Sequence, residues 1–275
     1  MPIEFPVQPP SRGLIRSLVS AESNLNRSIQ RLASGLRINS AADDPAGASI
    51  STRMRGRVVS IDRASQNVGE AASLLATADG AMESTADVLI RMRELTVAAA
   101  SDTMSSSDRT AVKTELDLLS AELDRIGNQT SYNGRVLLDG SASFTFQIGA
   151  DASATTSVTL DDVRAASLDV EPGDLVVSTA ANASTTLGKI DAAIDELATS
   201  RSKVGARINR LEFTASALSV ESENLNASVS RIRDADLAQE STRMLRAQLF
   251  QESARAMLTQ ANSGNDGILR MIRGS

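Results

Sequence analysis

A long heptad stripe is the feature that most constrains the fold of this chain. Between residues 61 and 99, small and apolar residues recur at spacings that alternate between three and four. They are Ile61, Ala64, Val68, Ala71, Leu75, Ala78, Met82, Thr85, Leu89, Met92, Thr96 and Ala99. This spacing predicts a long α-helix that packs along a coiled-coil seam. A second stripe beside it, formed by Leu74, Ala81, Val88 and Leu95, widens the apolar face, so we expect this helix to contact more than one neighbour.

The start of this helix is marked by Asp44 and Pro45. Aspartate is a good N-cap, and proline fits the first helical turn, where its missing N–H costs nothing. A helix that runs from Pro45 toward Ala100 would be roughly 80 Å long.

A shorter helix and a β-hairpin are expected next. Ser105 and Asp108 form a capping-box pattern, and Val112, Leu116, Leu119, Leu123 and Ile126 then follow on one helical face. Asn133-Gly134 and Asp139-Gly140 mark turns. Alternating apolar residues near 143–160, interrupted by a loop at 149–156, predict the hairpin. Residues 161–182 are expected to be irregular or short-stranded.

Heptads return from about Thr185 and continue to Ile232. Their members are Leu187, Ile190, Ile194, Leu197, Val204, Ile208, Leu211, Ala215, Leu218, Leu225, Val229 and Ile232. We therefore expect a mainly α fold: a long antiparallel coiled-coil rod with a small β-hairpin region and a helical coiled coil formed by the two chain ends.

Composition excludes much chemistry. The 275 residues contain no His, Cys or Trp, so the usual general base, thiol nucleophile and soft metal ligands are missing. We expect no enzyme activity and no cofactor. A formal net charge of −6 argues against nucleic acid or an acidic membrane as a partner. No apolar run approaches the length of a membrane span, and the N-terminus lacks a basic region followed by an apolar region, so we expect neither a membrane span nor Sec-type secretion.

Both chain ends carry apolar stripes on short helices. The stripe near the N-terminus consists of Leu14, Ile15, Leu18, Leu25, Ile29 and Leu32, and the stripe near the C-terminus of Leu237, Leu245, Leu249, Phe250, Met257 and Leu258. In an isolated chain these stripes would be exposed, which normally marks a partner surface. If the partner is another copy placed head to tail, the contact does not close and a helical filament results.

Several spaced motifs give the chain a clear resemblance to the bacterial flagellins. In chain order they are RLASGLRINSAADDPAG, RASQNVGEAASLLATADGAMES, LIRMRELTVAAASDT, ELDRIGNQTSYNGRVLL, FQIGADAS, SRIRDADLAQES and AMLTQAN. The resemblance covers most of the chain and implies a structural subunit of the filament used for swimming. Only about 45 residues lie between the start of the hairpin near 143 and the first heptad residue, Leu187, so the variable outer domains of larger flagellins are expected to be missing.

The resemblance implies a division into inner and wall domains. Residues 1–42 and 236–275 would form an inner coiled coil that lines a central channel, and residues 43–235 would form the filament wall. It also implies unfolded export through the flagellar type III apparatus, an export chaperone that masks the C-terminal helix, and contacts with filament cap and hook–filament junction proteins. The chain would be secreted and would work in the extracellular filament.

Two local features qualify the resemblance. Pro2, Pro6, Pro9 and Pro10 stand where the family usually has a helix-forming start, so we expect helix only from about Ser11. Flagellins that are sensed by the flagellin-specific Toll-like receptor present an Arg, a Leu and a Glu, which match Arg91, Leu95 and Glu115. The alternative for these three residues is an ion pair at the surface and a packing leucine.

Two other function classes fit the heptads. A hook–filament junction protein shares the fold plan but would match the middle motifs less closely. A cytosolic coiled-coil adaptor would not need complementary apolar ends.

Overall fold

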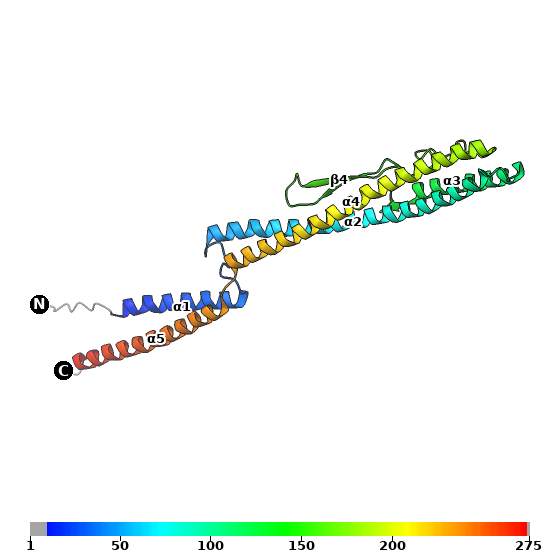
Figure 1. The fold of residues 1–275 in the computed structure, drawn as a ribbon. Helices are drawn as coiled ribbons and strands as arrows, with labels where there is room; N and C mark the ends of the chain where they lie inside the picture. The colour runs from blue at the N-terminus through cyan, green and yellow to red at the C-terminus, as the bar shows by residue number, and fades with distance from the viewer. Residues whose placement is uncertain (1–9, 274–275) are drawn as a thin grey trace. The chain divides into compact units, whose positions relative to one another are not determined.

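The computed structural model describes residues 10–273, which divide into two compact units. The terminal unit comprises the chain up to Gly56 and from Asn224 onward, and the central unit comprises Arg57–Glu223. The described helices are α1 (Pro10–Ser34), α2 (Pro45–Ala99), α3 (Ser106–Gln129), α4 (Ala180–Arg233) and α5 (Leu237–Arg273). The described strands are β1 (Ser131–Tyr132), β2 (Arg135–Val136), β3 (Ser143–Gln147) and β4 (Thr155–Thr159). The mainly α fold expected from the heptads is confirmed (Figure 1).

Helix α2 begins where its sequence signals predict. The backbone N–H of Gly47 donates to Asp44 Oδ1 at 2.9 Å, which satisfies one of the free donors of the first turn. A Cβ at Gly47 would lie 2.4 Å from the Asp44 carboxylate and 2.7 Å from Ile38 Cδ1. The residue at position 47 must therefore be glycine for the cap and the preceding loop to pack as they do.

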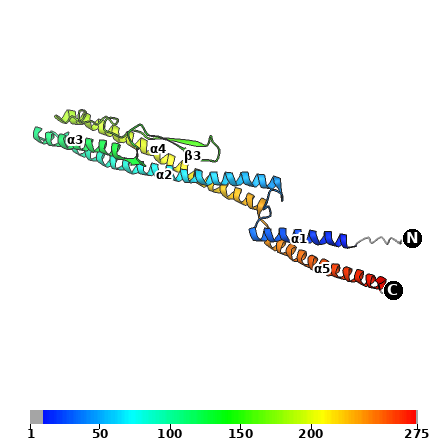
Figure 2. The same ribbon diagram turned by 180° about the vertical axis from the view of Figure 1, so that it is seen from behind.

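The core of the central unit follows the heptad seams. Helices α2 and α4 run side by side with α3 along their far half, as both ribbon views show (Figures 1 and 2). Every member of the α2 seam from Ile61 to Ala99 is buried, and Leu75, Met82, Leu89 and Met92 are fully inaccessible to solvent. On α4, the buried seam positions are Ile190, Leu197, Val204, Leu211 and Leu218. Large side chains thus fill the middle of this helical bundle, and their burial is its main source of stability.

Polar contacts at the edges set the alignment of α2 and α4. Arg93 Nε donates to Asp191 Oδ1 at 2.6 Å, and Arg201 Nε donates to Asp79 Oδ1 at 3.0 Å. Helix α3 begins with the predicted capping box, because Ser105 and Asp108 each accept from the other's backbone N–H. Buried Arg109 then donates to the carbonyl oxygens of Ala99 and Ser101, which satisfies the C-terminal end of α2.

The β-region contains the predicted hairpin and one smaller pair of strands. Strands β3 and β4 are antiparallel, with Phe144 opposite Val158, and residues 148–154 connect them. Strands β1 and β2 form a second hairpin around Asn133-Gly134, where both residues have positive φ, as a type I′ turn requires. The sequence had indicated only a turn there.

Helix α4 begins at Ala180, five residues before Thr185, from which the heptads are expected to return. Thr179 is the reason, since its carbonyl accepts from Ala183 N at 2.9 Å and its hydroxyl accepts from Asn182 N at 3.2 Å. The connecting segment before Thr179 is irregular, as expected, but it is well packed. Its buried members are Val163, Ala165, Leu168, Val170, Leu175 and Val177.

In the terminal unit, α1 and α5 run antiparallel and in contact along much of their length (Figure 1). Helix α1 begins at Pro10, within one residue of the expected start, and ends at Ser34. Gly35 follows, and its φ of +70° is the left-handed conformation typical of the residue after a helix.

Candidate self-assembly surface

Two motifs from opposite ends of the sequence meet in the terminal unit. Leu36 of RLASGLRINS forms a backbone bridge with Asp234 of SRIRDADLAQE. Arg37 N donates to Arg233 O at 2.6 Å, and Ala235 N donates to Gly35 O at 2.9 Å. The connector between α1 and α2 is therefore hydrogen bonded directly to the connector between α4 and α5.

The buried seam between α1 and α5 is made of small and polar residues. Its buried members are Ala21 and Ser28 on α1, and Glu240, Ala247 and Ala254 on α5. Glu240, which is only 4% exposed, accepts from Ser28 Oγ at 2.8 Å and lies 3.2 Å from the Arg243 guanidinium and 3.8 Å from that of Arg31. Alanines and one bonded carboxylate bury little apolar area, so the fully buried positions of this seam gain little from the hydrophobic effect.

The large apolar side chains of the terminal stripes mostly point away from this seam. Phe250 is 69% exposed, Leu249 is 63% exposed, and Ile15, Ile29, Leu237, Leu245 and Met257 are also exposed. Leu18, Leu25, Leu32 and Leu258 are half-buried, and the side chain of Leu14 lies outside the described residues. Val19, at 60% exposure, is a further exposed apolar residue of α1 that the stripe analysis missed. The described ends therefore present apolar surface to the outside of the single chain.

The two compact units carry opposite charge. The terminal unit contains 14 arginines and nine acidic residues, a formal charge of +5. The central unit contains 14 basic and 25 acidic residues, a formal charge of −11. Any contact that the terminal helices make with another molecule must therefore accommodate positive charge together with apolar side chains.

The three residues matched to the receptor motif lie together on α2 and α3. Arg91 Nη2 donates to Glu115 Oε1 at 2.8 Å, and Arg91 also pairs with Glu94 at 3.2 Å. The Glu115 hydrogen bond raises the pKa of Arg91 above its ordinary value. Leu95 is half-buried beside them. The side chains of Arg91 and Glu115 remain about half exposed, so an ion pair and an accessible surface coexist at this place.

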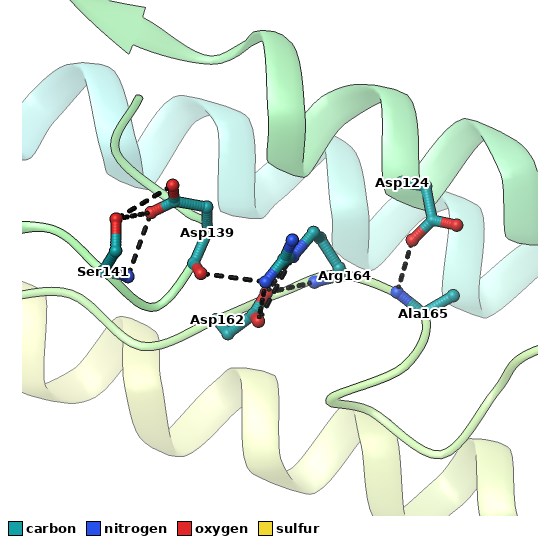
Figure 3. A network of polar contacts seen from close by, with 6 residues as sticks. All are labelled: Asp124, Asp139, Ser141, Asp162, Arg164 and Ala165. Carbon is teal, nitrogen blue, oxygen red and sulfur yellow. Dashed lines mark hydrogen bonds and ion pairs between the residues drawn. The ribbon is translucent and has the colours of Figure 1, made fainter. Parts of the chain in front are cut away.

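A polar network that the sequence analysis did not identify fastens the β-region to α3 (Figure 3). Arg164 Nη2 donates to Asp139 O at 2.9 Å and to Asp162 Oδ2 at 2.7 Å. Asp124 of α3 accepts from Ala165 N at 3.0 Å. These bonds join two loops to one helix.

Gly127 makes room for this network. A Cβ at position 127 would lie 2.6 Å from Arg164 Cγ, so the arginine packs directly over the helix backbone. The motif RIGNQTSYNGRVLL contains the glycine but gives no signal of its partner, which is 37 positions further along the chain.

Ionised carboxylates stabilise this region. The Arg164 hydrogen bonds hold the pKa of Asp162 below its ordinary value of 3.8. The pKa of Asp161 is lowered first by the Ser200 hydroxyl, at 2.7 Å, and then by Lys203, at 3.0 Å. Both groups therefore favour the folded state in their charged form.

Among the residues whose side chains the structure describes, Asp and Glu form no group of three that could hold a metal ion. No helix of the described chain has the length and apolarity needed to cross a membrane.

The fold and the terminal surface define the chain as a helical structural subunit. Residues 10–143 match the model of the bacterial flagellin N-terminal helical region, and residues 187–272 match that of the C-terminal helical region. The chain is 35% identical to flagellin of Bacillus subtilis (strain 168), over 94% of this chain and 96% of that one. It is 34% identical to the flagellar filament 33 kDa core protein of Treponema phagedenis, again over 94% and 96%.

A solved structure shares the fold at low sequence identity. A Vibrio parahaemolyticus protein described as flagellar hook-associated aligns with 70% of this chain and 100% of its own, with a TM-score of 0.61 and 15% identity. At 15% identity this likeness shows the fold alone, whereas the family models and the flagellin relatives show the family. The chain belongs to the bacterial flagellin family.

Family membership settles the function at a general level. The chain is a structural subunit of the extracellular flagellar filament that serves motility, in a short form without the variable outer domain. It is a member of a family of structural proteins that self-assemble as homopolymers. The matches with flagellins and filament core proteins favour the filament subunit over the junction protein and the adaptor.

Proposed function

We propose that copies of this chain join into the filament through the outward-facing apolar side chains of α1 and α5. The observation that carries the proposal is the inverted arrangement of the terminal pair, in which alanines and Glu240 are buried while Leu249 and Phe250 are exposed. Exposed apolar stripes of this length are normally covered by a partner. In a homopolymer that partner is another copy of the chain.

The domain arrangement is part of the same proposal. Residues 1–42 and 236–275 form the inner domain around the central channel, and residues 43–235 form the wall. These borders lie close to Leu36, in the connector from α1 to α2, and to Asp234, in the connector from α4 to α5. The large buried side chains of α2 and α4 suit a wall that keeps its fold in the single subunit.

Order in the terminal helices depends on assembly. The α1–α5 seam buries too little apolar area to hold two helices firmly, so the helices gain most of their stability when neighbours cover the outer stripes. A chain whose ends are weakly held also suits unfolded export through the type III apparatus. An export chaperone covers the stripe from Leu237 to Leu258 before export, and cap and hook–filament junction proteins contact the same ends at the two filament tips.

A host receptor of the Toll-like class is a further proposed partner. Arg91, Leu95 and Glu115 provide a charged and apolar surface of the type such receptors bind on related flagellins, and this surface is accessible in the single chain. In a reporter-cell assay with monomer, the triple change to Ala should remove the signal. An unchanged signal would exclude these residues as the contact.

Substitution of the exposed stripe tests the assembly proposal. Leu249→Ser with Phe250→Ser should abolish seeded filament growth, because two large apolar contacts between copies are replaced by hydroxyl groups. Ala256→Ser, at an exposed position of the same helix, is the matched control and should grow normally. Electron microscopy and sedimentation measure growth. Filaments from the double variant at the wild-type critical concentration would contradict the proposal.

A further inference from the structure

A groove between α1 and α5 has five arginines among its sixteen lining residues. It has a volume of about 1060 Å³, and its charged lining consists of Arg16, Arg27, Arg31, Arg243, Arg246 and Glu240. Five guanidinium groups face one carboxylate, so the basic groove carries a strong positive excess. Positive charge concentrated in a groove attracts a complementary anion.

Most of this charge is not neutralised within the chain. Glu240 is already shared among Ser28, Arg31 and Arg243. In the described part of the chain, Arg16 and Arg246 have no hydrogen-bond or ion-pair partner, and the Nε atom of Arg31 is buried without an acceptor. A buried donor that lacks an acceptor is costly, and the exposed guanidinium of Arg246 in the same groove is free to pair with a carboxylate of another molecule.

A second groove, on the side of α1 that faces residues 39–43, has the opposite character. Glu22 and Asp43 line it, with Arg27 at the border between the two grooves. Asp43 accepts from Ser40 N at 3.0 Å and from Asn39 N at 3.2 Å. These backbone bonds, the one from Ser40 first, lower its pKa. Glu22 is exposed, and no partner for it occurs among the described residues.

Apolar side chains accompany the charges on both sides. Phe250 and Met257 line the basic groove and are 69% and 58% exposed. Val19 stands one helical turn before Glu22 on the acidic side and is 60% exposed. An aromatic ring and a flexible thioether are suited to covering a branched apolar side chain.

We propose that the basic groove of one subunit receives the Val19–Glu22 face of α1 from a neighbouring copy. In this contact the Glu22 carboxylate pairs with the exposed guanidinium group of Arg246, while Val19 packs on Phe250 and Met257. The inference rests on the proposed assembly through the terminal helices, and it names the surface of the neighbouring copy that the basic groove contacts. Each copy carries both the donor face and the groove at different places, so the contact is heterologous and continues from copy to copy.

Charge reversal tests the contact from both sides. Glu22→Arg and Arg246→Glu each place like charges together, and each should raise the critical concentration for seeded growth by roughly tenfold. The double variant Glu22→Arg/Arg246→Glu restores opposite charges in reversed order, and its critical concentration should return to within about threefold of wild type. Glu252→Arg, an exposed reversal on α5 outside both grooves, is the control and should change growth little.

The outcomes separate this inference from the assembly proposal. If Glu22→Arg and Arg246→Glu both grow as wild type while Leu249→Ser/Phe250→Ser does not, the groove contact is wrong and terminal assembly stands. If the double reversal is as defective as its parents, or if Glu252→Arg is equally defective, the specific pairing is also wrong. Circular dichroism and unfolding of the central unit verify that every variant folds.

Discussion

The terminal helix pair and the central helical unit differ in which side chains they bury. In the central unit the large side chains, such as Leu89 and Met92, are buried between helices of one chain. In the terminal pair the buried positions are held by Ala247, Ala254 and Glu240, and Phe250 is left outside. The difference teaches that the first region carries its stability within the chain, whereas the second depends on other chains.

The largest expected contrast is in hydrogen exchange of the free monomer. Amides at the α2–α4 seam should be protected at least about a thousandfold more than amides of α1 and α5, because only the central unit has a large apolar core. In the filament the terminal amides should become protected as well. Strong protection of both ends in the monomer would break the comparison.

The second largest effect is expected from a cavity in the core of the central unit. Leu89→Ala leaves a cavity in the central unit and should lower the free energy of unfolding by about 2–5 kcal/mol. The neighbouring Ile90→Ala, at a half-exposed position, should change it by less than about 1 kcal/mol. Denaturant unfolding of the monomer measures both, and equal effects would mean that the seam is not the stabilising core.

A smaller effect is expected where Arg164 packs over α3. Gly127→Ala forces the arginine away from Asp139 and Asp162 and should cost about 1–3 kcal/mol. Gly80→Ala provides the matched control, because a Cβ there meets no atom within 4 Å. That variant should be neutral or stabilise the helix by up to about 1 kcal/mol. If Gly127→Ala left the free energy of unfolding unchanged, the polar network around Arg164 would be able to rearrange without a loss of stability.

The smallest expected effect is the loss of stability of the central unit at low pH. The pKa of Asp162 is lowered in the folded chain, so its contribution is fully present above the ordinary value of 3.8 and is lost as the pH falls through the lower folded value. The thermal midpoint of the central unit should therefore fall between about pH 5 and pH 2, and Asp162→Asn should make this fall shallower. Asp195→Asn, at an exposed site without a partner in the described chain, should leave the slope as in wild type.

The regular parts of the fold were predictable from the sequence because their causes are local. Heptad spacing identifies α2 and most of α4, and the Ser105–Asp108 and Asp44–Pro45 signals give two helix starts. The start of α4 was placed five residues late, because Thr179 caps the helix before the apolar repeat begins.

Long-range polar contacts were not predictable in the same way. Nothing near Glu240 in the sequence indicates that it is buried, since the burial depends on Ser28, which lies 212 positions away. Arg164 similarly acquires its role only when two loops meet α3. The sequence predicts the terminal apolar stripes, but which of their residues face inward depends on these pairings.

The bridge between Leu36 and Asp234 has a mechanical consequence. A rotating filament transmits torque through every subunit, and within the terminal unit the chain passes between long helices through residues 35–44, from α1 to α2, and through residues 234–236, from α4 to α5. Their backbone hydrogen bonds tie the connectors to each other. A pull on one connector is therefore shared by the other, because displacing either one breaks the backbone hydrogen bonds that Arg37 and Ala235 make between them.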